Sequence, residues 1–219
     1  MPHVSVDPAT LPPDRRYALM IGSIVPRPIA VVGTCLPDGS EPNLAPFSFF
    51  AGVGSDPMCL LFCPANRSDG SEKDSLRHAK PVAEGGCGEF TVSVATESII
   101  RQVVACAEEL PPACSEFELS GLTPAPSHRV RPPRVHESPI TFECRTLRVI
   151  RTTPERPSGG NIVLGEVVWI HADPSVMDDR FRVQADAVRA VGRMGGLDYV
   201  RTADRLELPW GAAALRGGT

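Results

Sequence analysis

The stretch Ile29-Ala30-Val31-Val32-Gly33-Thr34 is followed by the turn Leu36-Pro37-Asp38-Gly39 and by the run Asn43-Leu44-Ala45-Pro46-Phe47-Ser48-Phe49-Phe50. β-branched and aromatic residues favour strands, and a Pro-Asp-Gly turn between two such runs indicates that they pair antiparallel. A third apolar run, Met58 to Cys63, comes after Ser55-Asp56-Pro57. Strands and turns at this spacing predict an antiparallel meander.

The flanking sequence predicts more strands and a few short helices. Apolar residues recur at helical spacing from residue 11 to 24, with Pro12 and Pro13 in the first turn and Gly22 near the end. The same reasoning predicts a helix over 73–79, capped by Ser71 or Asp74, and a helix over 97–108. We further expect a strand over 89–95, an extended proline-rich surface connection over 123–139, and two long strands over 140–151 and 162–173.

These elements together predict a mainly β fold. The two long strands have no helix between them, so a parallel βαβ unit and a Rossmann fold are not expected. Six or seven strands with three short helices instead predict a closed or nearly closed antiparallel barrel.

Length and composition favour a soluble single domain over residues 1–219. The chain is 42% apolar and 22% charged with a formal net charge of −4, and it has no basic stripe, so we expect no nucleic-acid partner. No apolar run approaches the ~20 residues of a membrane span. Seven irregularly spaced cysteines indicate a reducing compartment, and the first residues do not resemble a signal peptide. We therefore predict a cytoplasmic protein.

Familiar catalytic patterns are missing from the sequence. It contains no Gly-x-Ser-x-Gly elbow, no His-Glu-x-x-His pair and no Walker or Gly-x-Gly-x-x-Gly loop. The histidines at positions 3, 78, 128, 136 and 171 do not have zinc-site spacing, so we expect no metal.

Three local sequences have the chemistry of a ligand site. Arg27 lies between two prolines, which hold its backbone in a stiff position, although a surface Arg in a rigid turn would look the same. Pro46 interrupts an apolar run and frees neighbouring backbone groups to border a flat aromatic ligand, or else marks a bulged edge strand. Lys73-Asp74-Ser75 offers a cation, a hydroxyl and a helix start, as a phosphate site does, although a plain helix cap also explains it.

At these places the chain resembles the flavin reductase-like, FMN-binding split-barrel family, which includes flavoredoxins and the reductase components of two-component monooxygenases. The similarity covers about residues 7–205. The matching segments, in the family's order, are Tyr17-x-x-Met-Ile-Gly-Ser-Ile-Val-Pro-Arg-Pro-Ile-Ala, Asp38-Gly39-x-x-Pro-Asn-Leu-Ala-Pro-Phe-Ser-Phe-Phe, Ser55-Asp56-Pro57, Lys73-Asp74-Ser75-Leu76-Arg77, Gly88-Glu89-Phe90-x-Val, Phe117-Glu118-Leu119-x-Gly-Leu-Thr, Pro132-Pro133-Arg134-Val135-x-Glu-Ser-Pro, Gly165-Glu166-Val167-Val168-x-x-His171 and Gly192-Arg193-x-Gly-Gly-x-x-Tyr199.

The resemblance implies a homodimeric antiparallel split barrel with one flavin, FMN or FAD, per subunit near the interface. The residues that it implies along the isoalloxazine are Asn43, Leu44, Ala45, Pro46, Phe47, Ser48 and Phe49, with the Ser48 hydroxyl at the N5/O4 edge. Lys73, Asp74 and Ser75 would hold the phosphate, together with Arg27 or Arg67. Arg193 would contact a phosphate or the dimer partner. Ser75 and His78 stand where the family usually has Thr and Asn.

The resemblance also implies an NAD(P)H-dependent flavin reductase that passes hydride from nicotinamide C4 to flavin N5. Reduced flavin would go to a monooxygenase or another electron acceptor. His171 is the one catalytic candidate, contacting nicotinamide or stabilising the charge of the reduced flavin, unless it is a strand-end His bonded to backbone. Two alternatives stay open: a flavoredoxin-like FMN electron carrier without NAD(P)H turnover, and a flavoenzyme with its own small organic substrate.

Overall fold

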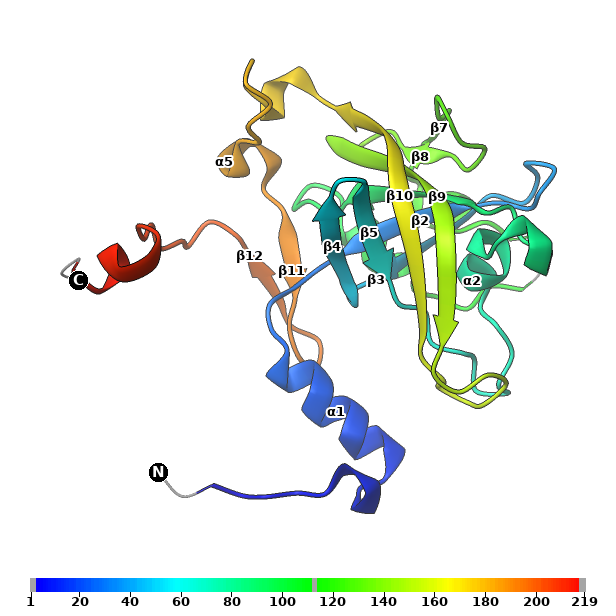
Figure 1. Ribbon diagram of the computed structural model, residues 1–219. Helices are drawn as coiled ribbons and strands as arrows, with labels where there is room; N and C mark the ends of the chain where they lie inside the picture. The colour runs from blue at the N-terminus through cyan, green and yellow to red at the C-terminus, as the bar shows by residue number, and fades with distance from the viewer. Residues whose placement is uncertain (1–2, 112–113, 217–219) are drawn as a thin grey trace.

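The centre of the fold is a seven-stranded antiparallel sheet with the strand order β3-β2-β6-β9-β10-β5-β4 (Figure 1). The computed structural model describes residues 3–111 and 114–216. The strands of this sheet are β2 (Ala30–Thr34), β3 (Asn43–Phe47), β4 (Phe50–Ser55), β5 (Met58–Phe62), β6 (Glu89–Val94), β9 (Ile140–Arg151) and β10 (Asn161–Ala172). The predicted pairing of the first two apolar runs, now β2 and β3, and the two long paired strands are confirmed. The meander does not continue into the third run, because β5 pairs with β10 and β4 near the other end of the strand order.

Smaller elements surround this sheet. Two small sheets contain β1 (Arg27–Pro28), β11 (Val191–Arg193) and β12 (Tyr199–Arg201), and β7 (Pro124–Ala125) and β8 (Arg134–Val135). The α-helices are α1 (Pro13–Ser23), α2 (Asp74–Ala79), α3 (Ile100–Ala105), α4 (Glu116–Ser120) and α5 (Ala185–Val188), and 3-10 helices cover Pro8–Thr10, Val82–Glu84, Pro174–Val176 and Gly211–Arg216. None of the described helices is long and apolar enough to cross a membrane.

Strand β2 is buried on both faces, which explains its unbroken apolar sequence. Ala30 and Val32 belong to the core cluster that also contains Phe62 and Phe90. Val31 belongs to a second cluster, formed with residues of β3, α3, α4 and β8. Successive side chains of a strand point to opposite faces, so this one strand joins the two halves of the core.

Gly33 continues β2 where another segment comes close. A Cβ at this position would lie 2.4 Å from the carbonyl oxygen of Pro133 and 2.5 Å from Thr91 Oγ1. Thr91 itself donates to that Pro133 oxygen at 2.8 Å. The proline-rich connection is therefore packed against the sheet at this point and is only partly the surface segment that its composition predicts; Val135 is fully buried.

Strand β3 lies at one end of the strand order, and Pro46 lies within it. Proline has no N–H to donate to a ladder, so it is tolerated in a strand with a neighbour on one side only. Val31 of β2 is the register partner of Pro46 on the paired side. The second edge of β3 has no strand beside it, and the elements that cover it form the candidate site described below.

Several elements differ from their prediction. The apolar run 43–50 divides after Phe47, and the chain turns back as β4 to pair with β5. The helix expected over 97–108 is reduced to α3, in which Val103 is buried and Val104 is 42% exposed. Lys73 occupies the N-cap of α2 in place of Ser71 or Asp74 and makes no side-chain capping bond. Helix α4 was not expected.

Helix α1 lies apart from the main sheet, and the described C-terminal residues extend away from it on another side (Figure 1). None of the residues of α1 is buried. Arg27, only 4% exposed, ties the end of this helix to the rest of the fold. Its guanidinium donates to the carbonyl oxygens of Ile21 and Ile24 at 2.5 and 2.7 Å and to that of Met194 at 2.9 Å.

Candidate functional site

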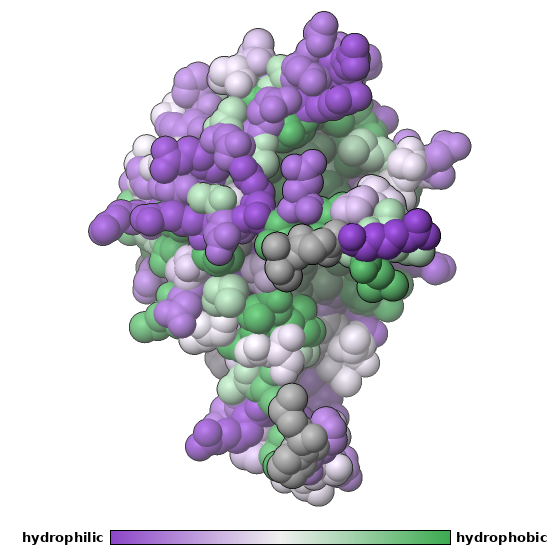
Figure 2. All heavy atoms as spheres, turned by 90° about the vertical axis from the view of Figure 1, so that its left-hand side faces the viewer, coloured by the Kyte–Doolittle hydropathy of each residue, from purple (hydrophilic) through white to green (hydrophobic). Residues whose placement is uncertain are grey.

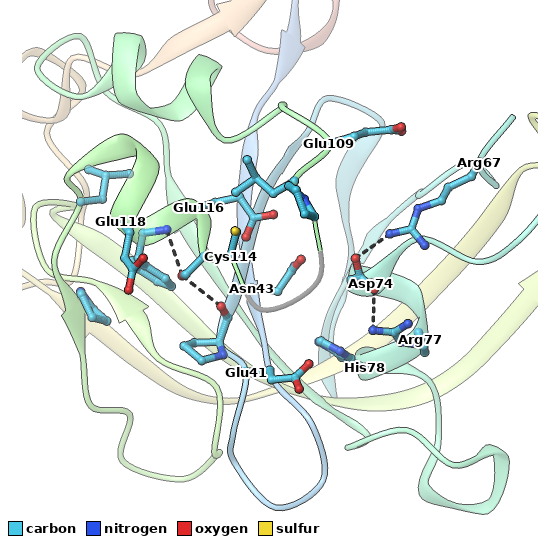
Figure 3. A pocket seen from close by; sticks show the side chains of 17 residues that line it. Glu41, Asn43, Arg67, Asp74, Arg77, His78, Glu109, Cys114, Glu116 and Glu118 are labelled. Carbon is cyan, nitrogen blue, oxygen red and sulfur yellow. Dashed lines mark hydrogen bonds and ion pairs between the residues drawn. The ribbon is translucent and has the colours of Figure 1, made fainter.

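A cavity of about 870 Å³ lies between the start of β3, helix α2 and the segment around α4. Figure 3 shows Asn43 and Glu116 on one side of it, facing Asp74, Arg77 and His78 of α2 on the other. A smaller recess of about 100 Å³ adjoins this cavity. The two share the lining residues Asn43, Arg67, Asp74, Glu109, Leu110 and Glu116, so they are two parts of one site.

The recess brings together two of the three local sequences singled out above. The residues predicted to bind the cofactor that line it are Asn43, Ala45, Pro46, Phe47, Arg67, Lys73, Asp74 and Ser75. The edge strand β3 thus lies beside the Lys-Asp-Ser segment, although about 30 residues separate them in the chain.

Cations and carboxylates lie together at the α2 end of the site, where Arg67 and Lys73 line the recess with Asp74, Glu108, Glu109 and Glu116. Asp74 is paired with two guanidiniums, those of Arg67 and Arg77, at 2.6 Å each. Lys73 has a looser ion pair with the exposed carboxylate of Glu109, at 3.5 Å. Because Asp74 is already neutralised by two cations, the ammonium of Lys73 can exchange its exposed partner for an anionic ligand at low cost.

A chain of buried polar side chains starts at Ser75. Asn43 Nδ2 donates to Ser75 Oγ at 3.2 Å and to Thr34 Oγ1 at 3.1 Å. Thr34 Oγ1 lies 3.4 Å from Nδ1 of His78. All four side chains are buried, and Nε2 of His78 has no hydrogen-bond partner among the described residues. Burial, with a smaller contribution from Arg77, lowers the pKa of His78 to about 4, so the imidazole is neutral at neutral pH.

Glu116 covers the free edge of β3. Its carboxylate accepts the backbone N–H of Leu44 at 3.0 Å and is 9% exposed. Burial raises the pKa of this carboxyl above its ordinary value, and the bond from Leu44 offsets part of that increase. Nearby, Ser115 donates its hydroxyl to the carbonyl oxygen of Pro42, so the start of α4 is fastened to the same edge.

Four of the residues predicted around the flavin do not line the cavity or the recess. The side chain of Leu44 is fully buried in the core. Ser48 accepts a hydrogen bond from Nε of Arg27 at 3.1 Å, and the same guanidinium lies 5.8 Å from the ring centre of Phe49. The donors of Arg27 are thus engaged with carbonyl and hydroxyl oxygens, where a phosphate contact was expected.

His171 and Arg193 also lie outside the cavity. Nε2 of His171 is 2.6 Å from Oε1 of the buried Glu143, in place of the backbone partner considered as the alternative. Arg193 donates to the carbonyl oxygens of Asp198 and Gly196 and lies 4.4 Å from the ring centre of Tyr199. The catalytic role of His171 and the phosphate or dimer contact of Arg193 stay predictions.

Sequence reasoning missed Thr34, Glu116 and the part that His78 takes in the site. Thr34 ends a strand whose apolar run gives no sign of a polar network. Glu116 reaches the site through tertiary contact, 72 residues from Leu44. His78 could have been found, because residues three apart share one face of a helix and Ser75 was already a candidate. No group of three or more potential metal ligands occurs in the part of the chain that the structure describes.

Comparison with known proteins agrees with this architecture. The sequence model of the flavin reductase like domain matches residues 21–183. A Deinococcus radiodurans protein is 36% identical over 217 residues, covering 95% of this chain and 90% of its own. Nitrilotriacetate monooxygenase component B from Bacillus cereus superposes with a TM-score of 0.86 at 30% identity, covering 95% of this chain and 100% of that one. The 2-nitrobenzoate 2-nitroreductase of Pseudomonas fluorescens gives a TM-score of 0.81 at 28% identity, covering 96% and 97%.

These matches confirm both the predicted resemblance and the split-barrel fold. They span the main sheet and the segments that form the cavity. The chain belongs to the flavin reductase-like, FMN-binding split-barrel family.

Proposed function

We propose that this chain is an NAD(P)H-dependent flavin oxidoreductase that holds FMN in the cavity beside β3. The observation that carries the proposal is the recess, where β3 and the Lys73-Asp74-Ser75 segment face one another. The family to which the chain belongs adds independent support.

The site has suitable dimensions for a flavin. Small-molecule sites typically occupy ~300–1,000 Å³, and the cavity of about 870 Å³ falls in this range. The recess of about 100 Å³ is too small to hold a flavin by itself, but it opens into the larger space. Pro46 leaves no N–H at its place in the edge strand, which suits a flat ring that lies along backbone.

The charges also fit a ligand with an anionic end. Lys73, Arg67 and Arg77 lie at the α2 end, among the carboxylates of Asp74, Glu108 and Glu109, and Asp74 is paired with both guanidiniums. The phosphate of FMN would bind here through Lys73 and the hydroxyl of Ser75, because charge-assisted hydrogen bonds are the strong ones.

A bound flavin would supply the hydride-accepting chemistry, and the protein contributes binding and orientation. Hydrogen bonds from Lys73 and Ser75 would hold the phosphate end, while Ala45, Pro46 and Phe47 would border the ring. Hydride transfer needs no general base in the protein, which agrees with the absence of a titratable dyad among the predicted ring-binding residues.

We also propose that reduced flavin is passed on to a monooxygenase partner. Nitrilotriacetate monooxygenase component B of Bacillus cereus shares the fold over the whole of its length, which supports this proposal.

A second copy of this chain is the other proposed partner. Helix α1 has no buried residue, and every residue of β4 after Phe50 is exposed. Figure 2 views the side from which the terminal segments extend, and hydrophobic side chains appear there between polar ones. A homodimer would cover such a surface.

The dimer is tested by sedimentation velocity on two variants at exposed valines. Val53→Asp in β4 should lower the apparent mass, whereas Val82→Asp should not. Two unchanged masses would contradict a dimer through β4.

The flavin proposal is tested by the absorbance spectrum of the purified protein, recorded anaerobically before and after adding NADH and then NADPH. We expect bound or added FMN to bleach rapidly with at least one donor. Flavin that binds and stays oxidised would favour a carrier or an enzyme with its own organic substrate. A protein that binds no FMN would overturn the proposal.

A further inference from the structure

We propose that His78 and Thr34 are positioning residues that set the direction in which Ser75 donates its hydroxyl hydrogen. The inference rests on the proposed function, because Ser75 is the hydroxyl assigned to the flavin phosphate. It concerns the chain of side chains Ser75, Asn43, Thr34 and His78, called here the relay.

The side chains of the relay are buried, and each lies within hydrogen-bond distance of the next. Ser75, Thr34 and His78 are 2%, 0% and 2% exposed. The contacts from Ser75 to Asn43, from Asn43 to Thr34 and from Thr34 to His78 measure 3.2, 3.1 and 3.4 Å. Asn43 and Ser75 line the recess, and Asn43 and His78 line the larger cavity.

The hydrogens of the relay can be assigned one by one. The amide nitrogen of Asn43 has two hydrogens, and both are used, one on Thr34 and one on Ser75. Thr34 Oγ1 therefore accepts from Asn43, and its own hydrogen is free to bond Nδ1 of His78. Ser75 Oγ likewise accepts from Asn43, so its hydrogen is left for a ligand oxygen in the recess.

The hydrogen bonds of the relay can also run in the opposite direction, and the site would then lose the Ser75 donor. If nothing accepted the hydrogen of Thr34, that hydrogen could turn to the amide oxygen of Asn43, with the amide reversed. Ser75 would then donate to the same oxygen and present only lone pairs to the recess. A phosphate dianion has acceptors only, so it would lose a hydrogen bond at Ser75.

His78 selects the first arrangement because it offers an acceptor to Thr34. A neutral imidazole has one acceptor nitrogen, and burial keeps this imidazole neutral at neutral pH. Asparagine also offers an acceptor, its amide oxygen, so it can serve the same purpose as His78 at this place in α2.

The experiment compares FMN with riboflavin, which lacks the phosphate, by titrating the quenching of flavin fluorescence. Thr34→Val removes the hydroxyl at nearly constant shape, and His78→Phe removes the acceptor. Each should weaken FMN binding about tenfold, the equivalent of about 1.4 kcal/mol for one lost charge-assisted bond, and leave riboflavin affinity within about twofold. The double variant should lose no more than Thr34→Val alone, because both changes interrupt one relay.

Conservative variants separate positioning from general damage. Thr34→Ser keeps the hydroxyl and His78→Asn keeps an acceptor, so both should retain the preference of the wild type for FMN. Thr96→Val, at a buried threonine outside the relay, is the matched control.

Two results would overturn the inference in different ways. A wild-type protein that binds FMN and riboflavin equally would remove the phosphate assignment, and the inference with it. A wild type that prefers FMN, with Thr34→Val and His78→Phe changing both affinities alike or neither, would refute the relay and leave the proposed function intact.

Discussion

Glu143→Gln should cost more stability than any other single conservative change of a carboxylate in this fold. Glu143 lies in β9 with no exposed surface. One oxygen accepts the backbone N–H of His128 and faces Nε2 of His171, and the other accepts the backbone N–H of Arg129, each at 2.6 Å. This carboxylate therefore ties the loop before β8 to β9 and β10.

The magnitude follows from this geometry. Glutamine has only one side-chain oxygen. Its NH2 group would therefore face either the N–H of Arg129 or the other two donors. In the better orientation, the unpaired N–H of Arg129 costs about 1–3 kcal/mol, and weakening two charge-assisted bonds costs about 1 kcal/mol each. The total is about 3–5 kcal/mol, which for a chain of this length lowers Tm by roughly 6–20 °C.

Thermal unfolding followed by circular dichroism, at one fixed protein concentration, measures the effect. Glu137→Gln is the matched control, because Glu137 is exposed and both its oxygens share the single N–H of Thr123. The control should unfold within about 2 °C of the wild type. A Glu143→Gln protein that unfolded as close to the wild type as the control does would show that the buried carboxylate does not hold the loop.

Acidity gives a second measurement on the same residue. Burial tends to raise the pKa of Glu143, but the three donors outweigh it and hold the pKa below its ordinary value. The contribution of Glu143 is therefore fully present above about pH 4.3, the ordinary pKa of Glu, and is lost as the pH falls through the lower value in the folded protein. The stability gap between wild type and Glu143→Gln should narrow in that acidic range.

The remaining predictions concern the phosphate end and two glycines. Replacing Lys73 by Ala and Ser75 by Val together should weaken FMN binding more than tenfold in a fluorescence titration, with a far smaller effect on riboflavin; equal losses would contradict a phosphate at α2. Gly165→Ala should lower the free energy of unfolding by about 1–3 kcal/mol in urea, because its Cβ would lie 2.5 Å from Cζ of Phe90. Gly22→Ala, with open space around it in α1, should leave stability unchanged or raise it by up to about 1 kcal/mol, and comparable losses at both glycines would refute the packing argument.

The parts of the fold that sequence predicts well are those with a strong local pattern. Strand β2 and the pair β9 and β10 have long runs of β-branched and apolar residues, and the structure confirms them. Strand β4 lacks such a pattern, because Ala51, Gly52 and Gly54 are small and the strand is exposed. Its pairing with β5 depends on backbone contacts, which leave little trace in the side-chain sequence.

The candidate site divides in the same way. The chemistry of Pro46 and of Lys73-Asp74-Ser75 is visible within a few residues of sequence, and the recess brings both together. Thr34 and Glu116 join the site only through tertiary contact. Arg27 has the sequence context of a ligand-binding cation because two prolines hold its backbone. In the structure its guanidinium instead donates to the carbonyl oxygens at the end of α1.

The covered edge of β3 has a consequence for the behaviour of the protein in concentrated solution. An exposed strand edge is a template on which another chain can add a strand, and such addition leads to aggregates. Pro46 removes one donor from this edge, and the carboxylate of Glu116 occupies the N–H of Leu44 with a group that cannot continue a ladder. Pro46 and Glu116, which both line the candidate site, thus also protect the sheet from growing by strand addition. Loss of Glu116 would free the N–H of Leu44 and make this edge prone to aggregation.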